Sequence, residues 1–287
     1  MGGCGGDEQP PAEWTLAQAM SQRRSYVAAA ELGGKIYVAG GMVGETGRPL
    51  ATFTRYDPRR DSWETLEQLP EPTRAAAAAT LGGRIYVVGG TTADGDNARL
   101  YAWDGQGWTA RAPMRAPRFN HSVVAVGGRL YVLGGLDGNG RESRDVLVYD
   151  PQVDQWSRAR SLPRPLHAFG AVAFRGEIWV IGGRSGEEVV SGVLIYDPRA
   201  DEWRRGPRMP KPMELLGAAV VGDEIHAVWE STYQIYDASE RTWRDGPRPL
   251  VTRHALEAFY VNGALYTIGG CTTALRDSPI VERREVD

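Results

Sequence analysis

Short apolar runs, each ended by a pair of glycines, recur along the chain at a nearly constant spacing. The runs read KIYVAGG, RIYVVGG, RLYVLGG, EIWVIGG and ALYTIGG, with the pairs at Gly40–Gly41, Gly89–Gly90, Gly134–Gly135, Gly182–Gly183 and Gly269–Gly270. Consecutive apolar positions rich in Val, Ile and Tyr are typical of strands that are buried on both faces. The pattern predicts an all-β protein made from copies of one unit.

Two further signals follow the first four of these runs and occur once more before the last run. An aromatic residue and an aspartate come first, at Tyr56–Asp57, Trp103–Asp104, Tyr149–Asp150, Tyr196–Asp197 and Tyr236–Asp237, and a tryptophan follows at Trp63, Trp108, Trp156, Trp203 and Trp243. A stretch of small apolar residues precedes each run, as in 75–81. Four strands in a period of roughly 40–50 residues are typical of a propeller blade. In the fifth unit, Trp229–Glu230 occupies the place of the glycine pair.

The two ends of the chain are expected to share the last blade. The last unit starts at Arg253 and has no tryptophan, whereas Trp14 has no strands before it. We therefore expect residues 13–20 to supply the fourth strand of the last blade, with Val286–Asp287 at the aromatic–Asp position. The predicted fold is a six-bladed β-propeller with four antiparallel strands per blade. It forms one domain over residues 13–287, behind a disordered tail of residues 1–12.

Composition excludes several classes of protein. The 287 residues carry a formal net charge of −3, so nothing predicts a nucleic-acid partner. No apolar run is long enough to span a membrane, and two cysteines make no disulfide framework. The four histidines show no metal-site spacing, and we expect no metal, no cofactor and a monomer.

At this point residues 13–287 resemble the kelch-repeat family, whose mark is the Gly-Gly, Tyr-Asp and Trp series quoted above. The resemblance implies the propeller fold and leaves function open. The family includes peptide- and protein-binding modules, a bacterial sialic acid mutarotase and copper-radical oxidases. The oxidases do not fit this chain, because their chemistry needs a Tyr–Cys crosslink, further Tyr and His copper ligands, and normally more blades.

In similar kelch propellers, ligands lie at one mouth of the central channel, formed by the starts of the innermost strands and the residues after each glycine pair. Carried over by position, the candidate ligand-binding residues are Tyr26, Arg74, Phe119, Asn120, His167, Arg184, Glu214 and His254. They differ among units while the scaffold repeats. Such a set could hold an anionic ligand by arginine hydrogen bonds and aromatic packing, or its arginines could simply pair with nearby carboxylates.

Two functions remain open from these residues. The favoured one is a non-enzymatic module that binds a peptide, protein or anionic glycan at the channel mouth. The alternative is a mutarotase-like enzyme for an acidic sugar such as sialic acid. In that case Glu214 would act as the general acid and base, with His167 or His254 beside it.

The N-terminal segment suggests a location. Gly3–Cys4, followed by small and acidic residues, resembles the end of a bacterial lipoprotein cleavage motif. Cys4 would then carry lipid, and the propeller would be extracytoplasmic and tethered to a membrane only through that anchor. Without lipidation, residues 1–12 would be an ordinary tail on a cytoplasmic protein.

Overall fold

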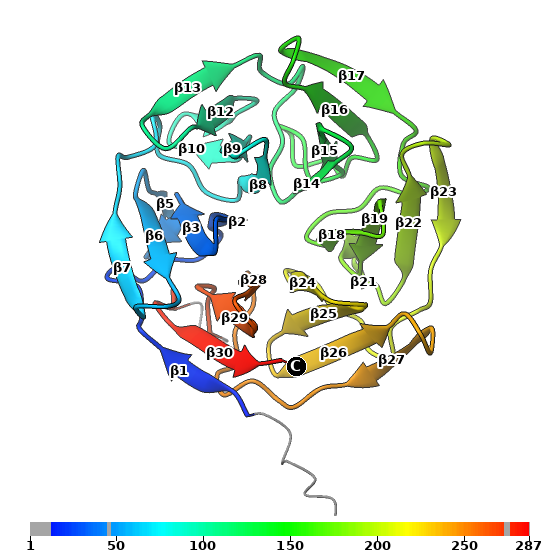
Figure 1. Cartoon of the computed structure of the whole chain (residues 1–287). Helices are drawn as coiled ribbons and strands as arrows, with labels where there is room; N and C mark the ends of the chain where they lie inside the picture. The colour runs from blue at the N-terminus through cyan, green and yellow to red at the C-terminus, as the bar shows by residue number, and fades with distance from the viewer. Residues whose placement is uncertain (1–12, 45–46, 273–275, 287) are drawn as a thin grey trace, which may run out of the picture.

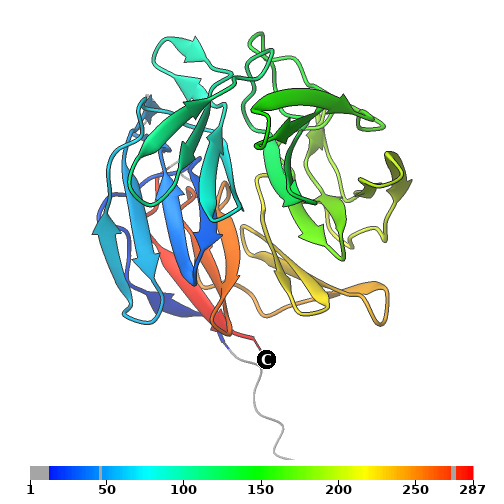
Figure 2. The same ribbon diagram turned by 45° about the horizontal axis from the view of Figure 1, so that its top comes forward.

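The protein is a six-bladed β-propeller, as expected from the sequence. A computed structural model describes residues 13–44, 47–272 and 276–286. Six four-stranded antiparallel sheets stand around a central channel (Figure 1), and the tilted view in Figure 2 shows them as separate blades. The described residues form no helix, and so they contain no helix that could cross a membrane. The predicted tail of residues 1–12, with Cys4, lies outside the described residues.

The first three blades follow the chain, with the earliest strand of each blade nearest to the channel. From the channel outward, their strands are β2 (Ala28–Leu32), β3 (Lys35–Ala39), β6 (Phe53–Asp57) and β7 (Ser62–Thr65) in blade 1; β8 (Ala77–Leu81), β9 (Arg84–Val88), β12 (Leu100–Trp103) and β13 (Trp108–Arg111) in blade 2; and β14 (Ser122–Val126), β15 (Arg129–Leu133), β16 (Val146–Asp150) and β17 (Gln155–Ala159) in blade 3.

The last three blades keep this order, except that the outermost strand of blade 6 comes from the start of the chain. Their strands are β18 (Gly170–Phe174), β19 (Glu177–Ile181), β22 (Val193–Asp197) and β23 (Glu202–Arg205) in blade 4; β24 (Gly217–Val221), β25 (Glu224–Trp229), β26 (Thr232–Asp237) and β27 (Thr242–Asp245) in blade 5; and β28 (Glu257–Val261), β29 (Ala264–Ile268), β30 (Val281–Glu285) and β1 (Thr15–Ala17) in blade 6.

The glycine pairs let neighbouring blades approach closely. At Gly40, which has a φ of +62°, an added Cβ would lie 2.4 Å from the carbonyl oxygen of Thr73 in the next blade. The amide of Gly41 donates to that oxygen over 2.9 Å. In blade 5, Glu230 makes the same bond, from its amide to the oxygen of Arg253 over 2.7 Å, with a φ of +51°. The backbone bond between blades is therefore kept where the glycines are lost.

The repeated aromatic and acidic residues join neighbouring blades at the outer edge. Trp63 Nε1 donates to the carbonyl of Gln18 over 2.8 Å, and Tyr56 donates its hydroxyl to Asp61 over 2.6 Å. Asp61 in turn accepts the amide of Gln18 over 2.8 Å. All six tryptophans of the repeat donate in the same way to a carbonyl in the segment that leads from the preceding blade into their own blade.

The ring closes through the N-terminal strand. β1 pairs with β30, with Thr15 opposite Arg283 and Ala17 opposite Val281. Trp14 is buried, and its Nε1 donates to the carbonyl of Pro247 over 2.8 Å. One detail of the prediction was wrong. The strand register places Arg284 opposite Leu265, which makes Arg284–Glu285, and not Val286–Asp287, the equivalent of Tyr–Asp.

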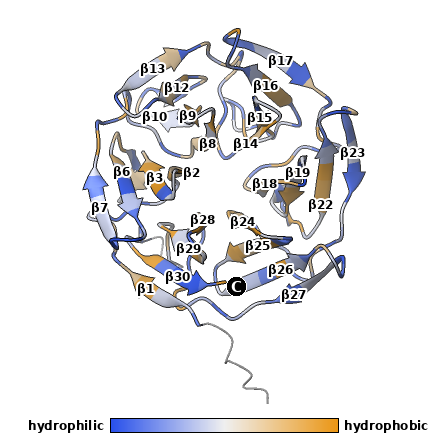
Figure 3. Ribbon diagram, in the orientation of Figure 1, coloured by the Kyte–Doolittle hydropathy of each residue, from blue (hydrophilic) through white to orange (hydrophobic). Residues whose placement is uncertain are grey.

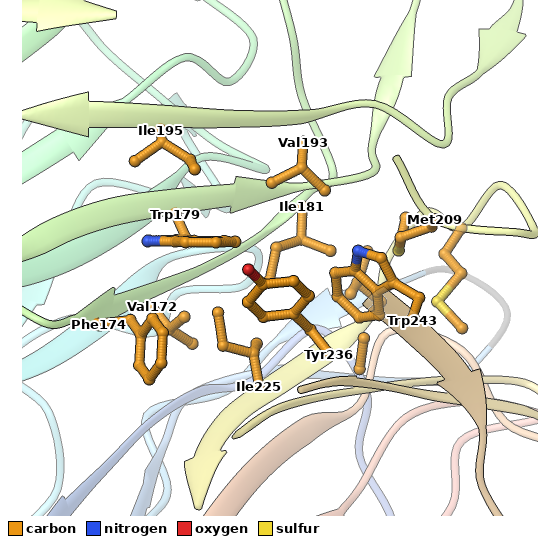
Figure 4. Close-up of a cluster of buried hydrophobic side chains, with 13 residues drawn as sticks. Val172, Phe174, Trp179, Ile181, Val193, Ile195, Met209, Ile225, Tyr236 and Trp243 are labelled. Atoms are coloured by element: carbon orange, nitrogen blue, oxygen red, sulfur yellow. The ribbon is translucent and has the colours of Figure 1, made fainter. Parts of the chain in front are cut away.

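Hydrophobic side chains fill the space between the blades. Figure 4 shows the cluster between blades 4 and 5, where Trp179 and Tyr236 pack with ring centroids 4.9 Å apart and Trp243 lies beside them. The outermost strands are more polar, as Figure 3 shows for β23. This burial on both faces explains why the second strand of each unit is apolar at consecutive positions.

Candidate functional site at the channel mouth

One mouth of the channel is framed by six equivalent residues in the left-handed region, with φ between 48° and 55°. They are Tyr26, Ala75, Asn120, Ala168, Leu215 and Ala255. Backbone hydrogen bonds of 2.7–3.1 Å run from blade to blade around this frame, from the amide of Ala75 to the oxygen of Tyr26 and onward to Ala255. Left-handed backbone is unfavourable for residues other than glycine, and these bonds offset its cost. We call this end of the channel the mouth.

The predicted ligand-binding residues gather at this mouth. The residue before each left-handed position forms a β-bridge with the residue after the glycine pair in five blades: Ser25 with Met42, Arg74 with Thr91, Phe119 with Leu136, His167 with Arg184, and His254 with Cys271. Blade 5 departs from the pattern, since no such bridge joins Glu214 and Ser231 among the described residues. The repeat therefore brings the variable positions of all six blades together around one opening.

Short hairpins extend the wall of the mouth in three blades. They are formed by β4 (Met42–Val43) with β5 (Arg48–Pro49), by β10 (Thr91–Thr92) with β11 (Gly95–Asp96), and by β20 (Arg184–Ser185) with β21 (Glu188–Val189). In blade 3 the wall is a turn in which Asp137 accepts the amides of Asn139 and Arg141. At the other end of the channel, the innermost strand turns directly into the second strand, as at Gly33–Gly34.

Glu214 is held in an ion pair. Arg184 donates to it from Nε and Nη2, both over 2.6 Å, and this pairing raises the pKa of Arg184. His167 lies nearby, with Nδ1 3.1 Å from Glu142 Oε1. Burial lowers the pKa of His167 despite the opposing effect of Glu142. The structure thus brings Glu214, Arg184 and His167 together, and it adds Glu142, which the sequence did not indicate.

Tyr26 and His254 belong to blades 1 and 6, whereas this group comes from blades 3, 4 and 5. His254 Nε2 is 2.9 Å from the sulfur of Cys271, whose thiol has its pKa raised to about 11, mainly by burial. Burial also raises the pKa of Tyr26, and Cys271 and Glu214 add to that effect while Arg74 opposes it. Tyr26 is therefore within electrostatic reach of both sides of the mouth.

Arg74 is a half-buried cation of the mouth, and no acidic side chain of the described residues forms an ion pair with it. Its one side-chain hydrogen bond among these residues is from Nη1 to the sulfur of Met42, over 3.5 Å. By contrast, Arg184 is neutralised by Glu214. A half-buried guanidinium without a counter-charge is suited to bind an anionic group.

Below the mouth, the innermost strands enclose a cavity of about 500 Å³, which we call the lumen. Alanine methyl groups make up much of its wall. The lumen also contains Glu257, the first residue of β28, which the sequence analysis missed. Burial raises the pKa of this carboxyl group to about 8. An alignment of the six innermost strands would have revealed it, because the five equivalent residues are alanine, serine or glycine.

Comparisons with known proteins agree with this architecture. The model of the KLHDC2/KLHL20/DRC7 kelch-repeats domain matches residues 24–228. Kelch-like protein 34 of Homo sapiens is 30% identical over 178 residues, which cover 59% of this chain and 27% of that protein. Alpha-scruin of Limulus polyphemus is 29% identical over 138 residues, which cover 45% of this chain and 15% of that protein. The chain thus spans less than a third of the length of these relatives.

A solved structure, that of YjhT, superposes with a TM-score of 0.81 and covers 92% of this chain and 95% of its own. At 14% identity, this likeness shows the fold alone. The family model covers more than half of the chain, and the repeat it describes is the one that builds all six blades. The chain belongs to the kelch-repeat family.

Proposed function

We propose that this propeller is a binding module that holds an acidic segment of a peptide or partner protein at the mouth. Kelch-repeat proteins generally bind proteins or peptides. The observation that carries the proposal is Arg74, a half-buried cation at the mouth with no carboxylate partner among the described residues.

The surroundings of Arg74 support a ligand of this kind. Tyr26 and Arg74 are neighbours around the mouth, because the amide of Ala75 donates to the carbonyl oxygen of Tyr26, and Arg74 acts to lower the pKa of Tyr26. The hairpins β4–β5 and β10–β11 stand on either side of Arg74, since it bridges to Thr91 and touches Met42. A carboxylate of the ligand would accept hydrogen bonds from Arg74, while neighbouring ligand atoms pack on Tyr26.

Binding of fluorescein-labelled acidic peptides, followed by fluorescence anisotropy, tests this proposal. The probes are short peptides rich in Asp and Glu, each paired with the same peptide carrying Asn and Gln. We expect the acidic peptides to bind more tightly, and Arg74→Gln to weaken them by about tenfold or more, the effect of one lost charge-assisted hydrogen bond.

The matched control is Arg60→Gln, because the side chain of Arg60 is 82% exposed in the turn between β6 and β7. This variant should bind like the wild type. Equal affinity for the acidic and amide peptides, or unchanged binding by Arg74→Gln, would contradict the proposal.

Sugar mutarotation is the second candidate, and one observation favours it: Glu214, His167 and Arg184 share one side of the mouth. The same geometry places it second. Glu214 accepts two hydrogen bonds from Arg184, and a carboxylate held in this way must leave its partner before it can take up a proton. The proposed location outside the cytoplasm, through Cys4, remains a prediction.

A further inference from the structure

Glu257 breaks the pattern of the innermost strands. The equivalent residues in blades 1 to 5 are Ala28, Ala77, Ser122, Gly170 and Gly217. The reason for small residues is visible in blades 4 and 5, where this position faces the next blade. A Cβ added to Gly170 would lie 2.9 Å from Leu216, and one added to Gly217 would lie 2.7 Å from Leu256. A glutamate therefore needs more space than the other blade junctions provide.

The junction between blades 6 and 1 provides that space. In the described residues, the frame of the mouth lacks one bond there, since Tyr26 N does not donate to Ala255 O. The described part of this junction also lacks a bond from Gly270 N to Arg24 O. That bond would be equivalent to the one from Gly41 N to Thr73 O. A Cβ on Gly269 would lie 3.2 Å from Arg24 O, whereas the corresponding distance at Gly40 is 2.4 Å. The two blades stand further apart, and Glu257 borders the lumen beside this junction.

The carboxyl group of Glu257 has no partner of its own. It makes no hydrogen bond or ion pair with any described residue. The elements packed against β28 bring few titratable groups: Glu31 on β2, Tyr266 on β29, and none on β24. Among the described residues, no lysine or arginine lines the lumen. Its wall combines alanine methyl groups with polar groups, and its carboxyl groups are those of Glu31 and Glu257.

We infer that the lumen binds an aliphatic primary ammonium group, with the cation at Glu257 and its carbon chain along the alanine wall. The source would be either a free alkylamine or a lysine side chain of a bound partner. A volume of about 500 Å³ lies in the range of small-molecule sites. The ammonium group would supply the missing counter-charge, and methylene groups would displace water from the alanine methyl groups. This site is separate from the anion site at Arg74.

Isothermal titration calorimetry with hexylammonium chloride tests the inference, with hexanol and hexanoate as neutral and anionic comparisons. The wild type should bind hexylammonium in preference to both, and Glu257→Gln should lose about tenfold or more in affinity. Because burial holds the carboxyl group protonated near neutral pH, the bound cation should release close to one proton at pH 7. Titrations in phosphate and in Tris, whose ionisation enthalpies differ, measure that release.

Two further arms complete the experiment. Glu64→Gln is the matched control, because the side chain of Glu64 is 58% exposed on the outer strand β7, and it should bind like the wild type. Nα-acetyl-lysine N-methylamide replaces hexylammonium to represent a lysine of a partner, and tighter binding of one probe identifies the source. Failure of the wild type to bind either amine, or equal binding by a folded Glu257→Gln variant, would overturn the inference.

Discussion

At the scale of single residues, two ionisable side chains near the axis carry the proposals. Arg74 at the mouth has no ion pair among the described residues, and Glu257 in the lumen makes neither a hydrogen bond nor an ion pair with them. By contrast, Arg184 pairs with Glu214, and the buried Arg253 pairs with Glu282. Burial of an ionisable group without a partner is costly, so the presence of Arg74 and Glu257 at partly buried positions points to a role in binding.

The carboxyl group of Glu257 should make stability depend on pH. Its pKa of about 8 in the folded protein lies above the ordinary value of 4.5, so the folded state holds a proton that the unfolded chain has lost. The free energy of unfolding should therefore fall as pH rises from about 5 to 8, by at most about 1.4 kcal/mol per unit and less where water enters the lumen.

Urea unfolding of the wild type and Glu257→Gln across this range measures the effect. As pH rises to about 8, the unfolding free energy of the wild type should fall relative to that of Glu257→Gln. Above pH 8, the difference between the two proteins should stay constant. The exposed-site control Glu64→Gln should run parallel to the wild type. A difference between wild type and Glu257→Gln that is constant with pH would show that the carboxyl group is not held protonated.

The candidate site was partly predictable at this scale. The repeat fixes the offset between the glycine pair and the start of each innermost strand, so Arg74, His167 and His254 could be assigned to one mouth from the sequence. The pairing of Glu214 with Arg184 could not, because it joins two blades through long side chains whose directions no repeat specifies. Glu142 lies in the loop after the glycine pair of blade 3, and the sequence of this loop differs from blade to blade, so the repeat does not predict its contacts.

At the scale of elements, the spacing of Gly-Gly, Tyr-Asp and Trp predicted four strands in each blade. It could do so because each of these residues makes the same contact in each blade that contains it. The hairpins β4–β5, β10–β11 and β20–β21 were not predicted. Their sequences differ and carry no alternation of apolar and polar residues. Their ends are joined by backbone hydrogen bonds to the second glycine of the pair, such as that from Leu50 N to Gly41 O over 2.9 Å. The wall of the mouth is thus the least predictable part of the fold.

The N-terminal strand β1 should be essential for stability. Trp14 is buried against Tyr233, with ring centroids 5.6 Å apart, and it hydrogen-bonds to Pro247 in the preceding segment. Trp14→Ala should lower the free energy of unfolding by about 3–5 kcal/mol, and deletion of residues 1–20 should lower it further.

Thermal and urea unfolding check this prediction, with Leu16→Ala as the control. Leu16 lies in the same strand but is 64% exposed, and its truncation should change stability by less than about 0.5 kcal/mol. An unchanged melting temperature after Trp14→Ala or after the deletion would contradict closure of the ring by β1.

At the scale of the whole molecule, the two ends of the channel differ. One end has the left-handed frame, the hairpins and the mixed charges, whereas the other has direct turns between the first two strands of each blade. The ring is also uneven around its circumference, since the junction of blades 6 and 1 lacks two of the backbone bonds that join the other described blades. Function is therefore assigned to one face, and Glu257 borders the lumen beside the junction that lacks these bonds.

The most direct test of the account locates the ligand on the propeller. Amide hydrogen exchange is measured by mass spectrometry with and without the tightest acidic peptide from the anisotropy experiment. If the acidic peptide binds at the mouth, exchange should slow in the hairpins β4–β5 and β10–β11 and in the segment around Arg74. Exchange in the turns at the other end, such as Gly33–Gly34, should not change. Protection of those turns, with the hairpins unchanged, would show that the opposite face binds and would contradict the proposed function.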